Sequence, residues 1–226
     1  MTESDVAHIA VQPNGPYLVS GSVSLTRRQI VRSEQGEPMT WQTTDRLEKP
    51  ATFALCRCGG SANKPFCDGT HAGNGFDGTE TAPTDSYDDR AATYEATGVV
   101  VRDDRAICEH AGFCGNRLTT VWKMARGSAT EDTVVRAQMM SMIEHCPSGA
   151  LSYRLDPEGD DVEPDLSLGI AVTKDGPYFV TGGVAVERAD GLPFERRNRV
   201  TLCRCGQSSN KPLCDGSHQR AEFRDG

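Results

Sequence analysis

Two stretches decide the organisation of this 226-residue chain: CRCGGSANKPFCDGTH at residues 56–71 and CRCGQSSNKPLCDGSH at residues 203–218. Twelve of their sixteen positions are identical. Each stretch begins Cys-x-Cys, reaches a third cysteine after eight more residues, and places a histidine four residues beyond it. Three thiols and one imidazole clustered in this way predict a metal-binding loop rather than a disulfide framework.

The candidate ligands fall into two equivalent sets. They are Cys56, Cys58, Cys67 and His71 in the first copy, and Cys203, Cys205, Cys214 and His218 in the second. Zinc would take such a set tetrahedrally, whereas a 2Fe–2S cluster would take two ligands on each iron, which also makes four. The ligand count leaves both metals open, although Cys-x-Cys is a cramped spacing for structural zinc.

The motif C-x-C-x2-S/T-x3-P-x-C-D-G-S/A/T-H resembles that of the CDGSH iron–sulfur (NEET) family, and both copies match it at every position. The resemblance implies one 2Fe–2S cluster per copy. By that resemblance, the first two cysteines bind one iron, and the third cysteine and the histidine bind the other. Family members also carry a hydrophobic residue five positions after the histidine, where this chain has Phe76 and Phe223.

The repeat extends upstream of the cysteines. IAVQPNGPYLVSGSVSL at residues 9–25 returns as IAVTKDGPYFVTGGVAV at residues 170–186. Apolar residues alternate in both copies, which predicts half-buried β-strands. Further short strands are expected at residues 53–55 and 200–202, directly before the cysteines. The first copy is longer around residues 32–46, which we expect to form a surface loop, because such insertions cost little.

A segment of different character separates the repeats. Polar, acidic stretches at residues 72–90 and 156–165 look like linkers on either side of it. We therefore expect a first CDGSH repeat at residues 1–80, a middle domain at residues 94–155 and a second CDGSH repeat at residues 166–226.

The middle segment carries the three remaining cysteines, Cys108, Cys114 and Cys146. CEHAGFC, followed later by CPSGAL, resembles the divergent single-cluster type of bacterial ferredoxin. The usual first run is C-x2-C-x2-C, but Ala111 occupies its central position. We expect a 3Fe–4S cluster, which needs only three protein ligands. A 4Fe–4S cluster would need a fourth ligand, and His110 is the nearest candidate.

A helix is expected just before Cys146, over residues 131–145. Ser128 and Glu131 fit a capping box at its start, and Thr130 is a competing cap. Apolar residues, several of them methionines, recur in it with roughly helical spacing. We expect this stripe to pack in a core.

These features together predict a mainly β, loop-rich fold. NEET proteins with one motif form homodimers, in which a β-cap covers two cluster loops. A chain with two motifs looks like that dimer written as one polypeptide. By resemblance we expect a monomer with internal pseudo-twofold symmetry, strands of both halves in a shared β-cap, two cluster-binding loops and a small α+β ferredoxin-like insertion.

Composition and charge limit the binding partners and the location that we expect for the protein. The formal net charge of −8 argues against non-specific nucleic-acid binding. No apolar run of about 18 residues is present, so no membrane association is expected. The polar start MTESDVAHIA does not resemble a signal peptide. A cytoplasmic location follows as an expectation, and reducing conditions there favour metal-bound cysteines over disulfides.

Catalytic signatures are missing from the sequence: it shows no Ser/His/Asp arrangement, no P-loop and no Rossmann fingerprint. We therefore expect an electron-transfer protein rather than an enzyme, with a redox partner protein such as a reductase, an oxygenase or an apo-acceptor. The alternative is redox or pH sensing, or transfer of a labile cluster. The third option is an enzyme or a structural zinc module.

Overall fold

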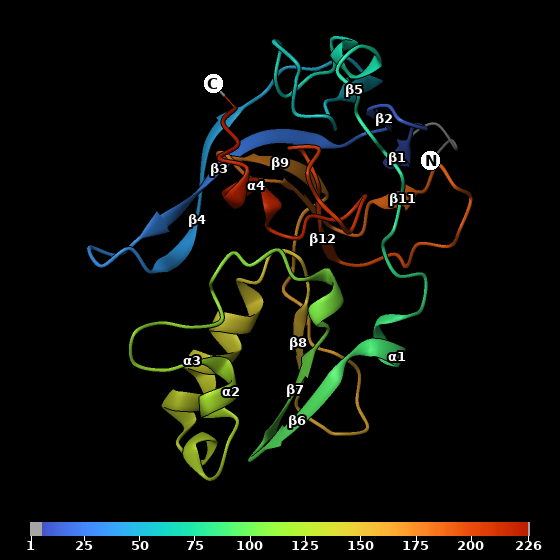
Figure 1. Ribbon diagram of the computed structural model, residues 1–226. Coiled ribbons are helices and arrows are strands. Elements are labelled where there is room, and N and C mark those ends of the chain that lie inside the picture. The colour runs from blue at the N-terminus through green and yellow to red at the C-terminus, as the bar shows by residue number, and fades with distance from the viewer. Residues whose placement is uncertain (1–5, 226) are drawn as a thin grey trace.

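The computed structural model describes residues 6–225, and the outermost residues of the two expected repeats, 1–5 and 226, lie outside the described residues. Two β-sheets lie together at one end of the molecule, and a smaller mixed domain lies at the other (Figure 1). The strands are β1 (His8–Val11), β2 (Tyr17–Ser20), β3 (Ser24–Arg32), β4 (Pro38–Arg46), β5 (Phe53–Leu55), β6 (Ala92–Ala96), β7 (Val99–Asp103), β8 (Leu151–Arg154), β9 (Gly169–Thr173), β10 (Tyr178–Thr181), β11 (Ala185–Glu187) and β12 (Arg199–Leu202). The α-helices are α1 (Tyr87–Arg90), α2 (Val121–Met124), α3 (Thr133–Glu144) and α4 (Ser217–Arg220).

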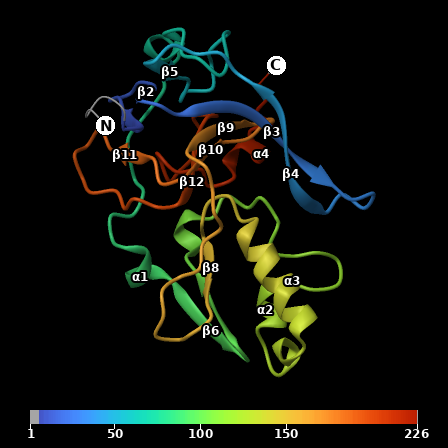
Figure 2. The ribbon, with the colours of Figure 1, turned by 180° about the vertical axis from the view of Figure 1, so that it is seen from behind.

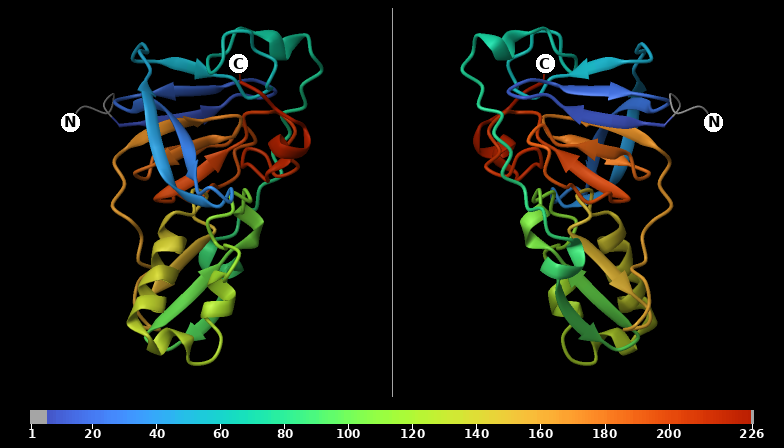
Figure 3. Two further views of the ribbon diagram at one scale, coloured as in Figure 1. Left: turned by 90° about the vertical axis from the view of Figure 1, so that its left-hand side faces the viewer. Right: turned by 90° about the vertical axis from the view of Figure 1, so that its right-hand side faces the viewer.

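The two repeats exchange strands. One sheet has the order β11-β1-β2-β5 and the other the order β12-β10-β9-β3-β4. Strand β11 of the second repeat pairs in parallel with β1 of the first, and β3 of the first repeat pairs in parallel with β9 of the second. Figure 3 shows the two sheets stacked above the middle domain. The reciprocal exchange confirms the shared, pseudo-twofold β-cap, and β5 and β12 confirm the strands expected before the cysteines.

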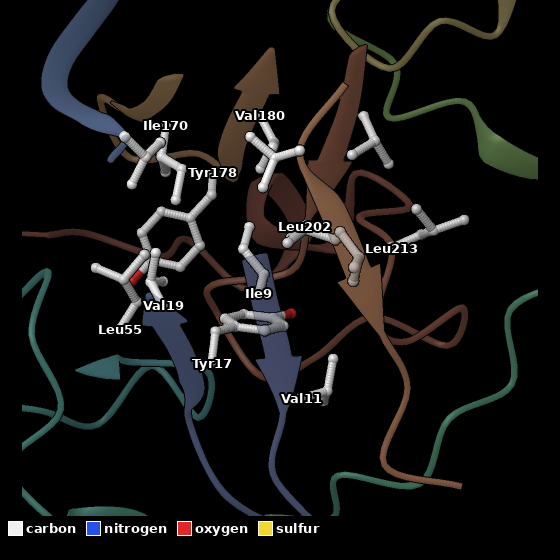
Figure 4. Close-up of a cluster of buried hydrophobic side chains, with 14 of the residues drawn as sticks. Ile9, Val11, Tyr17, Val19, Leu55, Ile170, Tyr178, Val180, Leu202 and Leu213 are labelled. Atoms are coloured by element: carbon white, nitrogen blue, oxygen red, sulfur yellow. The ribbon is translucent and has the colours of Figure 1, made fainter. Parts of the chain in front are cut away.

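The core lies between these sheets. Tyr17 and Tyr178, equivalent residues of the two repeats, meet edge to face with ring centroids 5.9 Å apart and an interplanar angle of 89°. Figure 4 shows both rings among aliphatic side chains of the two repeats. In β2 the alternation is as expected, with Val19 buried and Leu18 exposed. In β10 all four residues are buried, so the expectation of a half-buried strand is wrong for the second copy.

The additional segment of the first repeat is not a surface loop. Residues 32–46 belong to a hairpin in which β3 and β4, each nine residues long, pair in antiparallel fashion. Trp41 on β4 packs on Phe179 of β10, with ring centroids 5.4 Å apart, and on Phe113 of the middle domain at 5.3 Å. This contact covers the outer face of β10, which explains why that strand has no solvent-facing side.

The middle domain is a three-stranded antiparallel sheet, β6-β7-β8, packed against helices α2 and α3 (Figure 2). Met139 and Ile143 of α3 are fully buried there, which confirms core packing for the apolar stripe. Helix α3 begins at Thr133, later than expected. Its cap is Asp132, whose carboxylate accepts the Val134 N–H at 2.8 Å. The expected caps fail because Ala129–Glu131 forms a separate 3-10 turn.

Neither acidic stretch is a free linker. Within residues 72–90, the N–H groups of Thr81 and Ala82 both donate to the Lys211 carbonyl, at 2.7 and 2.9 Å. Helix α1 follows in the same stretch, with Tyr87 buried. In the stretch 156–165, Val162 bridges back to Tyr153 of β8. Both segments are polar in composition but satisfy their backbone groups on neighbouring elements, which composition alone does not reveal.

No helix among residues 6–225 combines the length and apolar character that a bilayer crossing requires.

Candidate metal centres

Each CDGSH loop presents its candidate ligands in two pairs. The two sulfurs of Cys-x-Cys lie 3.8 Å apart in the first loop and 3.9 Å apart in the second. The third cysteine sulfur lies 3.4 Å from the Nδ1 atom of His71 in the first loop, and 3.3 Å from that of His218 in the second. The same two spacings therefore recur in both repeats.

These spacings match two ligands on one tetrahedral metal. With metal–sulfur bonds of about 2.3 Å and metal–nitrogen bonds of about 2.0 Å, two sulfurs stand roughly 3.8 Å apart, and a sulfur and a nitrogen roughly 3.5 Å apart. Across residues 6–225, no three histidine, cysteine or acidic side chains converge as ligands of one ion. Two ligands for each of two irons is the arrangement that a 2Fe–2S cluster takes.

The Asp-Gly step of the motif shapes each loop. The Asp68 carboxylate accepts the N–H groups of Ala62 and Thr70, at 2.8 and 3.0 Å. These bonds lower the pKa of Asp68, first through the Thr70 hydroxyl and then through the two amides. Gly69 follows with φ of +88°, a left-handed conformation that favours glycine. The turn brings the histidine back towards the third cysteine.

Each loop is also hydrogen-bonded to a tyrosine of the opposite repeat. The Tyr17 hydroxyl donates to the carbonyls of Cys203 and Pro212, at 2.8 and 3.1 Å. The Tyr178 hydroxyl donates in the same way to the first loop, at 2.9 Å to Cys56 and 3.0 Å to Pro65. Each tyrosine thus supports the ligand loop of the opposite repeat. This role was not predictable from spacing within one segment, and its only trace in the sequence is the GPY tripeptide that recurs in both copies.

A buried arginine separates the first two cysteines of each loop. Arg57 and Arg204 are each 1% exposed. Arg204 donates to Asp225 at 2.9 Å and to the Thr173 carbonyl at 2.7 Å, whereas the ion pair of Arg57 with Glu80 is longer, at 3.8 Å. Both arginines also lie over the phenylalanine that follows the histidine, Phe76 or Phe223. The identity of Cys-Arg-Cys in both copies was the available sequence signal.

The middle domain brings its three cysteines together. Cys108, Cys114 and Cys146 line one cavity of about 130 Å³, together with His110 and Ala111. The Nδ1 atom of His110 lies 4.0 Å from the Cys108 sulfur. Burial raises the pKa of the Cys108 thiol, and it raises that of Cys114 to about 11. These thiols would lose their protons only to a metal or another strong compensating charge.

The second CDGSH loop is more buried than the first. Cys203, Cys205 and Cys214 are all buried, whereas Cys58 and Cys67 are only partly so. A shared sulfur–sulfur hydrogen bond lowers the pKa of Cys203 to about 6 and raises that of Cys205. Burial raises the pKa of Cys214. One buried neighbour from the middle domain is Glu109, whose pKa burial raises to about 8. No motif or spacing in the sequence marks Glu109 as a neighbour of this loop.

Comparisons with known families agree with this geometry. The model of the iron-binding zinc finger of CDGSH type matches residues 14–72 and 175–219. The model of the divergent 4Fe–4S mono-cluster matches residues 94–156. No curated protein and no solved structure matches the chain. The chain is therefore an iron–sulfur protein that carries two CDGSH-type regions, with a divergent mono-cluster domain inserted between them.

Proposed function

We propose that the protein is an electron carrier with two Cys3His 2Fe–2S clusters and one three-cysteine cluster of the 3Fe–4S type. The ligand pairs carry this proposal: sulfurs 3.8 Å apart, and a sulfur and a nitrogen 3.4 Å apart, recur as a set in one loop. Such clusters accept and release single electrons, at potentials set by ligands, hydrogen bonds and exposure. All eleven candidate ligands named from the sequence are assigned to the three centres.

The surrounding residues suit one-electron chemistry. Arg57 and Arg204 place a buried positive charge beside each ligand set, which favours the more negative, reduced form and so raises the potential. Main-chain N–H groups donate to ligand sulfurs, from Gly60 to Cys58 at 3.4 Å for example, which acts in the same direction. A neutral imidazole in place of a fourth thiolate also removes negative charge.

In the middle domain the proposed ligands are Cys108, Cys114 and Cys146. Ala111 lies in the same cavity, where a fourth thiolate of the usual pattern would otherwise be available. Three thiolates suffice for 3Fe–4S. The matched family model is described as a 4Fe–4S domain, so His110 is kept as the fourth ligand of the alternative cluster.

Iron, sulfide and zinc analysis of anaerobically purified protein, with EPR spectroscopy, tests this assignment. About seven irons per chain and an oxidised-state EPR signal near full occupancy are expected for two 2Fe–2S clusters and one 3Fe–4S cluster. Ala111→Cys should convert the middle centre to 4Fe–4S and abolish that signal, and Cys114→Ser should remove it. About four irons would leave the middle domain empty, and stoichiometric zinc without sulfide would reject the whole assignment.

A second candidate function is cluster transfer or redox sensing, and the first loop favours it. Cys67 and His71 there are partly exposed, and a side-chain carbon at Gly69 would meet nothing within 4 Å. Transfer of iron and sulfide to an apo-ferredoxin within minutes, abolished by Cys67→Ser and retained in Cys214→Ser, is the expected result of that function. Electron transfer without such release would reject it.

We further propose that the chain acts as a cytoplasmic monomer and delivers electrons to a reductase or an oxygenase rather than catalysing a reaction itself. The monomer is supported by the exchange of β3 and β11, which completes the pseudo-twofold cap within one polypeptide. Light scattering coupled to size exclusion should give a mass near that of one chain, 24.4 kDa. A stable dimer would contradict this part of the proposal.

A further inference from the structure

Among residues 6–225, the middle domain contacts the Asp-Gly turn of the second CDGSH loop but does not approach Gly69 in the equivalent turn of the first loop. A side-chain carbon placed on Gly216 of the second loop would lie 2.9 Å from the Glu109 carbonyl oxygen and 3.3 Å from Cδ2 of His110. Next to this contact, Asn210 Nδ2 donates to the Ala106 carbonyl at 2.6 Å. The segment that follows η3 (Arg105–Ile107) therefore lies directly on the second loop.

The residues in this contact are also bonded to candidate ligand sulfurs. The N–H of His110 donates to the Cys108 sulfur at 3.4 Å, and the N–H of Gly216 donates to the Cys214 sulfur at 3.5 Å. A ligand of the middle centre and a ligand of the second CDGSH centre are thus separated by two sulfur-bonded backbone segments in direct contact.

The equivalent turn of the first loop has no such neighbour. Gly69 has nearly the same backbone conformation as Gly216, with φ of +88° against +82°. Nothing described in residues 6–225 lies within 4 Å of a side-chain carbon at Gly69. The sequence repeat therefore supplies a matched pair of positions, identical in residue and conformation, of which only one touches the middle domain.

The two CDGSH loops do touch each other. Cys58 and Cys205 form an isolated antiparallel bridge. A side-chain carbon on Gly59 would lie 2.6 Å from the Cys205 carbonyl oxygen, and one on Gly206 would lie 2.6 Å from that of Cys58. Only glycine allows so close an approach of the two backbones. The second loop thus contacts the middle domain on one side and the first loop on the other.

We propose that the three centres form a linear relay, with the second CDGSH centre between the middle centre and the first CDGSH centre. This order rests on the electron-transfer function proposed above. In each internal step one electron leaves one centre and one arrives at the next, and no covalent bond changes. An external one-electron reductase supplies the electron at one end, and an acceptor protein removes it at the other. Gly216 and Glu109 are positioning residues for the transfer between the middle centre and the second CDGSH centre.

Adjacency can be tested without any electron transfer between the centres. Cys67→Ser and Cys214→Ser each delete one 2Fe–2S centre, which assigns the two reduced 2Fe–2S EPR signals. Cys114→Ser then removes the middle centre. The expected result is slower spin relaxation of the second-loop signal alone, because only that centre loses a paramagnetic neighbour. A change confined to the first-loop signal, or equal changes in both, would overturn the order.

The contact itself is tested with matched substitutions in the intact holoprotein. Gly216→Ala should slow the arrival of a photo-injected electron at the second centre several-fold more than Gly69→Ala, which carries the same backbone strain but meets nothing within 4 Å. Asn210→Ala and its counterpart Asn63→Ala provide a milder pair if Gly216→Ala does not fold. Equal effects within both pairs would overturn the role of the contact. Correct adjacency in chemically reduced protein, without arrival of the photo-injected electron at either 2Fe–2S centre, would instead reject the electron-transfer function and leave the order standing.

Discussion

The first and second CDGSH loops have nearly the same sequence but different surroundings. Cys214 of the second loop is 2% exposed and lies beside the middle domain, whereas its counterpart Cys67 is partly exposed. Gly216 is crowded by Glu109, and Gly69 faces open space. The difference arises outside the loops, from the inserted domain, which contacts Gly216 and Asn210 of the second loop. Ligand identity is therefore encoded locally, while the environment that sets potential and lability is encoded elsewhere in the chain.

The largest expected effect concerns the buried arginines. Arg204→Met removes the closer of the two arginine partners of Asp225, leaving Arg27 at 3.2 Å, and also removes the donor to the buried Thr173 carbonyl. Together these losses should lower the free energy of unfolding by about 3–5 kcal/mol. Arg57→Met should cost less, about 1–3 kcal/mol, because the Arg57–Glu80 pair is longer. Anaerobic guanidinium unfolding followed by circular dichroism measures both. Equal losses of unfolding free energy would mean that the two arginines stabilise their loops equally.

The next effect concerns the β3–β4 hairpin, which is present in the first repeat only. Trp41 contacts Phe113 and Phe179 and donates to the His145 carbonyl at 3.4 Å. Because this side chain is only partly buried, Trp41→Ala should cost about 2–3 kcal/mol and expose the second loop. Hydrogen exchange should then rise in β10 and α3. Met39→Ala, on the same strand but 58% exposed, is the control, and an equal rise there would exclude a specific contact.

A smaller effect is expected when a tyrosine of one repeat is substituted and the stability of the opposite loop is measured. Tyr17→Phe removes two hydrogen bonds to the second loop, and Tyr178→Phe removes two to the first. Each change should cost about 1–2 kcal/mol and should speed iron loss to a chelator from the opposite repeat only. Faster iron loss from the repeat that carries the substitution would contradict the inference that each tyrosine supports the opposite loop.

The smallest expected effect compares the unmodified loops. If each loop holds a 2Fe–2S cluster as proposed, Cys214→Ser should retain only the first of these two centres, and Cys67→Ser only the second. Chelator and mild acid should bleach the first centre several-fold faster, a difference of about 1 kcal/mol, because its ligands are more exposed. The decay of visible absorbance measures the two rates. Equal rates would show that cluster lability does not follow ligand exposure.

Much of the fold was predictable because its signals are local or repeated. The alternation in residues 9–25 identified β2, and the short apolar runs before the cysteines identified β5 and β12. The hairpin in residues 32–46 was missed because no second copy exists for comparison and its strands are polar. The acidic stretches were misjudged because composition does not show that Thr81 and Ala82 bond to Lys211, more than a hundred residues away.

By itself the sequence determined the candidate ligand sets, the internal repeat and the presence of a three-cysteine domain, because each depends on spacing within one short segment. Only the tertiary structure decided which strands are exchanged, that each tyrosine supports the opposite loop, and that the middle domain contacts the Asp-Gly turn of the second loop. Those features rest on contacts such as Trp41 with His145 and Asn210 with Ala106, each joining residues 104 positions apart. No periodicity or motif records a contact of that kind, because it exists only once the chain has folded.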